Sequence, residues 1–142
     1  MSEAKLDVIV KAINLMEYTM TITSNRKRYP VKHLTLVKRI QNRCMDIYEY
    51  LLDANRLKLD TSKSERQELQ TKAISCCDKL SCYAELSMKL NLIGSDTVEY
   101  WQKQINDVKY MSIAWRSKDK KDNFRLSIVW HAMFSTSTLM AT

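Results

Sequence analysis

The sequence contains almost no glycine or proline, with one residue of each in 142. Sheets and turn-rich folds use both residues to end strands and to form tight turns. Their scarcity therefore favours long helices joined by few, short connections, and this length fits one domain with a single core. The chain also lacks a run of about 18 apolar residues, so we expect no membrane-spanning helix and no membrane partner.

No group of residues has the spacing of a catalytic or metal site. His33 and His131 lie far apart, and neither has partners at metal-ligand spacing. The single glycine, Gly94, excludes a glycine-rich phosphate loop. His33 reads as part of the polar face of a helix. We therefore expect no enzymatic activity, no metal and no cofactor.

The four cysteines include no Cys-x-x-Cys pair. Cys44, Cys76 and Cys77 lie within helical patterns, where cysteine usually acts as a small buried apolar residue. The first residues, Met1-Ser-Glu-Ala-Lys-Leu-Asp, contain no long apolar core, so we expect no secretory signal. A cytoplasmic location with reduced thiols is the default expectation.

Apolar residues recur at spacings of three and four in four segments, which predicts helices over about 4–22, 31–57, 63–91 and 95–118. Ser62 and Glu65 match a capping box before the third helix. Gly94 suits the left-handed position that ends that helix, and Ser95 or Asp96 would cap the fourth. The short connections predict an all-α fold, an antiparallel up-down-up-down four-helix bundle.

The second helix has two distinct faces. Its outer face is basic in the first half and carries Asp46, Glu49 and Asp53 in the second, and we also expect Tyr50 on this outer face. Trp101 and Trp115 on the fourth helix are expected in the core. The apolar face of the second helix consists of Leu34, Val37, Ile40, Cys44, Ile47, Tyr48, Leu51 and Ala54.

The chain after Lys118 differs from the rest. Residues 118–122 read as a charged linker, so the predicted organisation is a bundle over 1–118 and a C-terminal tail over 119–142. The tail carries an apolar patch and a Ser/Thr-rich end. It could form a short fifth helix or a strand, or it could be disordered or non-native, a cloning or frameshift scar. The patch consists of Phe124, Leu126, Ile128, Val129, Trp130, Met133 and Phe134.

Positive charge is concentrated in one quarter of the chain. Residues 24–58 contain nine basic and three acidic residues, a net charge of +6 out of +7 for the whole chain. Such a cluster attracts polyanions, although a solvated lysine-rich face is the alternative. The candidate nucleic-acid-binding residues are Arg26, Lys27, Arg28, Lys32, Lys38, Arg39 and Arg43, with Arg56 and Lys58 as weaker candidates.

An ordered set of segments resembles one family. Arg28-Tyr-Pro-Val-Lys-His-Leu-Thr-Leu-Val-Lys-Arg-Ile-Gln is similar to the opening of the second helix in Avd proteins, the accessory variability determinants of diversity-generating retroelements. Tyr48-Glu-Tyr-Leu-Leu-Asp-Ala-Asn, the break Leu90-Asn-Leu-Ile-Gly-Ser and the close Ile105-Asn-Asp-Val-Lys-Tyr-Met-Ser-Ile-Ala-Trp follow in the family's order. The resemblance covers about residues 5–118. It departs at Ala114, where a glycine often precedes the tryptophan, and in the tail.

The resemblance implies a homopentamer, a barrel of five bundles with a basic surface. It implies binding to a reverse transcriptase and to RNA or DNA, the template RNA or its cDNA, in support of mutagenic reverse transcription. A related family is encoded by intervening sequences in large-subunit ribosomal RNA genes and shares the bundle. The alternatives are therefore a protein of that type and a helical module that binds only protein.

Overall fold

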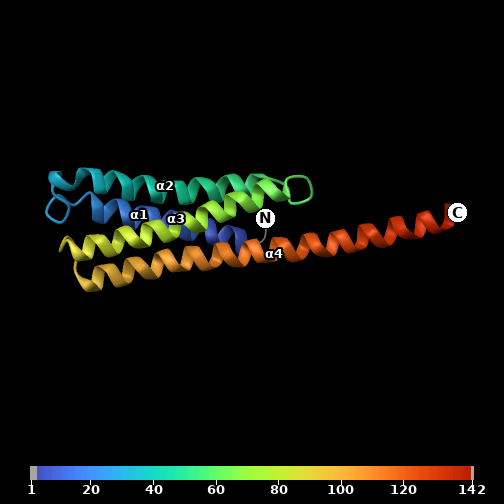
Figure 1. Cartoon of the computed structure of the whole chain (residues 1–142). Helices are drawn as coiled ribbons and strands as arrows, with labels where there is room; N and C mark the ends of the chain where they lie inside the picture. Colours follow the sequence, from blue (N-terminus) through green and yellow to red (C-terminus); the bar gives the residue numbers. More distant parts are fainter. Residues whose placement is uncertain (1–2, 142) are drawn as a thin grey trace.

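The computed structural model describes the backbone of residues 3–141 and the side chains of residues 7–122 and 128–133. All its regular structure in this range is helical. The elements are α1 (Glu3–Thr23), a 3₁₀ turn η1 (Val31–His33), α2 (Leu34–Arg56), α3 (Lys63–Lys89) and α4 (Ser95–Ala141). Successive helices run in opposite directions (Figure 1). The predicted all-α fold of four long helices is confirmed, and the second helix begins with the 3₁₀ turn after Pro30.

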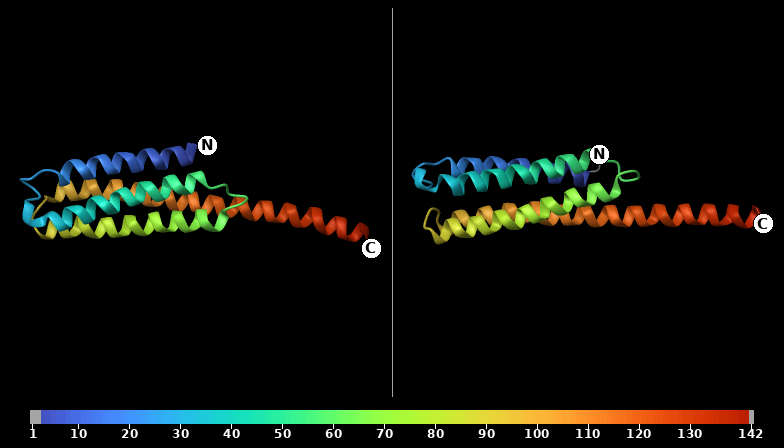
Figure 2. Two further views of the ribbon diagram at one scale, coloured as in Figure 1. Left: turned by 90° about the horizontal axis from the view of Figure 1, so that it is seen from above. Right: turned by 45° about the horizontal axis from the view of Figure 1, so that its top comes forward.

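Each helix packs against two neighbours, because α1 and α3 both contact α2 and α4. Figure 2 shows the four helices side by side. Trp101 and Trp115 are buried as predicted, and so are Cys44, Cys76 and Cys77. Six of the eight residues predicted for the apolar face of α2 are buried, namely Val37, Ile40, Cys44, Ile47, Leu51 and Ala54.

Tyr50 does not lie on the outer face, so that prediction is wrong. Its ring is partly buried against the core, and Lys72 Nζ of α3 lies 5.9 Å from the ring centroid. Leu34 is 45% exposed, since it lies in the first turn of α2, at the edge of the bundle. The apolar pattern thus identified the buried centre of α2 and was less accurate at its margins.

Two predicted caps also differ from the structure. Ser62 precedes α3, but its side chain makes no capping hydrogen bond, and its carbonyl accepts one from the Arg66 amide at 2.9 Å. Asn91, with φ of 60°, takes the left-handed position predicted for Gly94. The Leu92 amide then donates to the Ser87 carbonyl at 2.9 Å, a bond that closes the end of α3. Asparagine tolerates this conformation because its side chain is short and polar.

The fourth helix does not end near Lys118. It continues without interruption to Ala141, 47 residues in all, so the expected charged linker at 118–122 is helical. At 1.5 Å per residue it is about 70 Å long. Figure 1 shows its C-terminal part extending beyond the other three helices. Ile128, Val129, Trp130 and Met133 are exposed on this part, whereas the predicted patch residues Phe124, Leu126 and Phe134 lie outside the described side chains.

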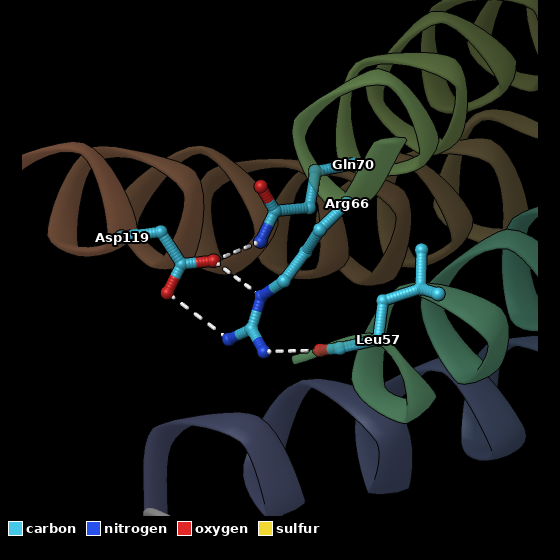
Figure 3. A network of polar contacts seen from close by, with 4 residues as sticks. All are labelled: Leu57, Arg66, Gln70 and Asp119. Carbon is cyan, nitrogen blue, oxygen red and sulfur yellow. Dashed lines mark hydrogen bonds and ion pairs between the residues drawn. The ribbon is translucent and has the colours of Figure 1, made fainter. Parts of the chain in front are cut away.

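A buried polar network fixes α4 where it leaves the bundle (Figure 3). Asp119, which we had expected in a tail, is only 3% exposed, and Arg66 of α3 is 2% exposed. Arg66 Nε donates to Asp119 Oδ2 at 2.7 Å and Nη2 donates to Oδ1 at 3.0 Å. Gln70 Nε2 donates to Asp119 Oδ2 at 2.7 Å, and Arg66 Nη1 donates to the Leu57 carbonyl at 2.9 Å. The network therefore ties α4 to α3 and to the α2–α3 connection.

Candidate nucleic-acid interface

The connection between α1 and α2 lies at the same end of the bundle as the turn between α3 and α4 (Figure 1). Its shape follows from two residues. Asn25 Oδ1 accepts hydrogen bonds from the amides of Lys27 at 3.0 Å and Arg28 at 3.4 Å, which is a side-chain-stabilised turn. Tyr29 is buried, with 2% exposure, and anchors the connection to the core. The three consecutive cations between these anchors, Arg26, Lys27 and Arg28, are consequently exposed.

Six of the nine predicted binding residues gather at this end. They come from the connection, from η1 and from the first turns of α2, and all six are exposed. Among the described side chains, none of the six forms an ion pair. We call this group the basic end. It consists of Arg26, Lys27, Arg28, Lys32, Lys38 and Arg39.

The other three predicted residues lie apart from the basic end. Arg43 is partly buried and its Nη1 lies 3.7 Å from Asp46 Oδ2. Arg56 Nη1 lies 3.6 Å from Asp53 Oδ1 at the opposite end of α2, about 25 Å along the helix axis from Arg39. Lys58 lies in the α2–α3 connection beside Arg56. A contiguous strand on the basic end would therefore not reach Arg56 or Lys58 without crossing the acidic second half of α2.

The basic end also contains a cavity of about 230 Å³, which the sequence did not indicate. Ser24, Arg26 and Gln41 contribute polar groups to its lining, and Val31 and Leu34 contribute apolar ones. Gln41 Nε2 donates to Thr23 Oγ1 at 2.9 Å, and that hydroxyl donates to the Thr19 carbonyl at 2.7 Å. Val31 and Leu34 are apolar residues within a basic stretch of the sequence, but that pattern alone did not predict that they are exposed or that they line a cavity.

The comparisons with known proteins leave the chain without an assigned family: no family model, no curated protein and no solved structure matches it. No helix in the described part of the chain is long and apolar enough to cross a membrane. The described residues likewise hold no group of three or more His, Cys, Asp or Glu that could bind a metal ion. The basic end and its cavity are thus the features from which a function can be argued.

Proposed function

We propose that this protein is a non-enzymatic accessory protein of a diversity-generating retroelement. In this proposal the basic end binds nucleic acid, the template RNA or its cDNA, and the bundle also binds the reverse transcriptase to support mutagenic copying. The observation that carries the proposal is the group of six exposed cations on a four-helix bundle, none of which forms an ion pair with a described side chain. The ordered resemblance of residues 5–118 to Avd proteins supplies the biological setting.

The binding would be mainly electrostatic. Lysine and arginine neutralise phosphates and release counterions, which gives salt-sensitive affinity with little sequence preference. Six contacts to a single strand correspond to a slope of about −4 in a plot of log K against log salt concentration. Assembly as a homopentamer, which the resemblance suggests, would present five basic ends, and multivalency would strengthen weak individual contacts.

The experiment replaces all six basic-end residues by Gln and measures RNA binding at several salt concentrations. We expect binding to be lost or to retain little salt dependence, while helicity and mass in light-scattering chromatography stay unchanged. The matched control replaces six exposed lysines on other surfaces by Gln, which gives the same net charge. These are Lys11, Lys63, Lys79, Lys103, Lys118 and Lys120. Equal loss in both variants would mean that total charge, and not the basic end, determines binding.

A second candidate is a bundle of the ribosomal intervening-sequence type that acts as a helical protein-interaction module. The observation in its favour is exposed aromatic surface on α4, outside the residues of the basic end: Tyr100 is 51% and Tyr110 is 62% exposed. This candidate predicts an oligomer that does not bind RNA at low salt. Co-expression with a reverse transcriptase encoded beside the gene separates the two, because only the first candidate predicts a stable complex with it.

A further inference from the structure

We propose that the cavity at the basic end binds one unpaired nucleobase that carries an exocyclic amino group. This inference rests on the proposed function, because the surrounding cations would hold the phosphates of the same strand. Pockets for drug-sized ligands occupy about 300–1,000 Å³. At about 230 Å³ the cavity has room for one ring system and not for several nucleotides.

The walls of the cavity suit a flat apolar ring. Val31 is 62% and Leu34 is 45% exposed, and both line the cavity with Pro30 and Tyr29. Large apolar side chains exposed among cations contribute nothing to binding a phosphate. They would instead pack against the faces of a base turned out of a single strand, in the position that aromatic side chains or guanidinium groups usually occupy.

Gln41 is the polar group that would form a hydrogen bond to the base. The orientation of its side-chain amide is determined by its hydrogen bond to Thr23. Thr23 Oγ1 donates its only proton to the Thr19 carbonyl, so it can only accept from Gln41. The amide NH₂ of Gln41 therefore points to Thr23. Its carbonyl oxygen has no hydrogen-bond donor among the described residues, and it is an acceptor. A base with an amino group, adenine, cytosine or guanine, can donate to this oxygen, whereas the only ring donor of uracil, N3–H, lies between two carbonyl oxygens that would repel the Gln41 oxygen.

Arg26 connects the cavity to the phosphate-binding surface. It is exposed and also lines the cavity. Its guanidinium can bind the phosphate of the inserted nucleotide, because guanidinium presents several donors to one anion. The remaining cations of the basic end lie on the connection, η1 and α2 around this point, where they can hold the flanking phosphates. The cavity would thus give the basic end a preference for single strands over duplexes.

The first experiment titrates the wild-type protein with adenosine, cytidine and uridine monophosphates and follows the Gln41 side-chain amide by NMR. We expect the adenosine and cytidine nucleotides to shift this signal and the uridine nucleotide to shift it far less. Gln41→Leu lacks this signal, so nucleotide binding to that variant is followed by the Leu34 backbone amide, and we expect equal affinities for the three nucleotides. If no nucleotide shifts the Gln41 signal, or if all three shift it equally, the inference is overturned.

The second experiment compares a single-stranded RNA with an abasic strand of the same length. We expect the abasic strand to bind at least about fivefold more weakly, the lower limit of what one stacked base contributes. Leu34→Gln, which replaces an apolar wall of the cavity by a polar side chain, should reduce that difference and leave the salt slope unchanged. Thr35→Gln is the matched control, since Thr35 is exposed in the same turn but does not line the cavity.

The two proposals fail in distinguishable ways. Salt-sensitive binding that is equal for intact and abasic strands would refute the base site and leave the proposed function standing. Nucleotide binding at Gln41 without RNA binding would support the base site and refute the proposed function.

Discussion

The two ends of the bundle use arginine in opposite ways. At the basic end, six cations are exposed and have no ionic partner among the described side chains. At the distal end, which we define by the α2–α3 connection 57–62, Arg66 is buried and its donors are used by Asp119 and the Leu57 carbonyl. Its guanidinium also lies 5.0 Å from the centroid of Trp115. Exposed charge suits binding, whereas the buried pair fixes one arrangement of helices.

The difference has an energetic basis. A buried ion pair adds little net stability, because desolvation of both charges offsets their attraction. Removing one partner is nevertheless expensive, since the other charge stays buried alone. An exposed cation is hydrated in any case, so its removal changes stability by only a few tenths of a kcal/mol. The distal end should therefore be sensitive to substitution and the basic end tolerant of it.

The largest expected effect is that of Asp119→Ala. It leaves Arg66 buried without its carboxylate and leaves Gln70 Nε2 without its acceptor, which should cost about 3–5 kcal/mol of unfolding free energy. Urea denaturation followed by circular dichroism measures it. Asp122→Ala is the control, because Asp122 is one turn further along α4 and forms no ion pair among the described residues. Equal effects of the two substitutions would refute the role given to the pair.

Truncation gives a second comparison at the same end. A chain ending at Lys118 lacks Asp119 and should lose about the same 3–5 kcal/mol. A chain ending at Asn123 keeps the network and should lose less than about 0.5 kcal/mol, the usual effect of changes at exposed positions. The described side chains beyond this point, 128–133, are all exposed. If the chain ending at Lys118 is as stable as the chain ending at Asn123, the bundle ends at 118, as the sequence suggested.

The sequence was sufficient for the number and order of the helices, and insufficient for the end of α4 and for this network. Apolar spacing identified the buried side of α2 because six of its eight residues are buried at intervals of three and four. Asp119 continues the same spacing from Trp115 on α4, but a charged residue is predicted to lie on the surface. Its partner Arg66 is 53 residues away, and no local pattern relates the two. A charged residue at a core position is therefore informative only once the helix that faces it is known.

The candidate site shows the same limit in another form. The sequence identified all six cations of the basic end, because clustering along the chain is a local property. It could not show that Arg43 and Arg56 have carboxylates within 4 Å, although Asp46 and Asp53 are three residues from them. It also missed the cavity, because Gln41 and Thr23 come from different helices and are 18 residues apart.

A further expected effect concerns the thiols between the two ends. Burial raises the pKa of Cys44 to about 11 and that of Cys77 to about 12. The folded state thus retains these protons longer than the unfolded chain, whose thiols titrate near pH 8.5. Their contribution to stability is complete below that pH and is lost as the pH rises toward about 11. The unfolding free energy should therefore fall from about pH 9 to pH 11, and less so in Cys77→Ala.

The labelling rates of the same thiols test which end of the bundle determines the stability of the core. In the native protein a disulfide reagent should label exposed Cys82 rapidly, and Cys44, Cys76 and Cys77 only through opening of the fold. Asp119→Ala should accelerate labelling of the three buried thiols, and the logarithm of the rate should rise in proportion to the stability it loses. The six-glutamine variant of the basic end should label like wild type. Faster labelling in that variant would mean that the exposed cations also stabilise the bundle, and the contrast between the two ends would no longer hold.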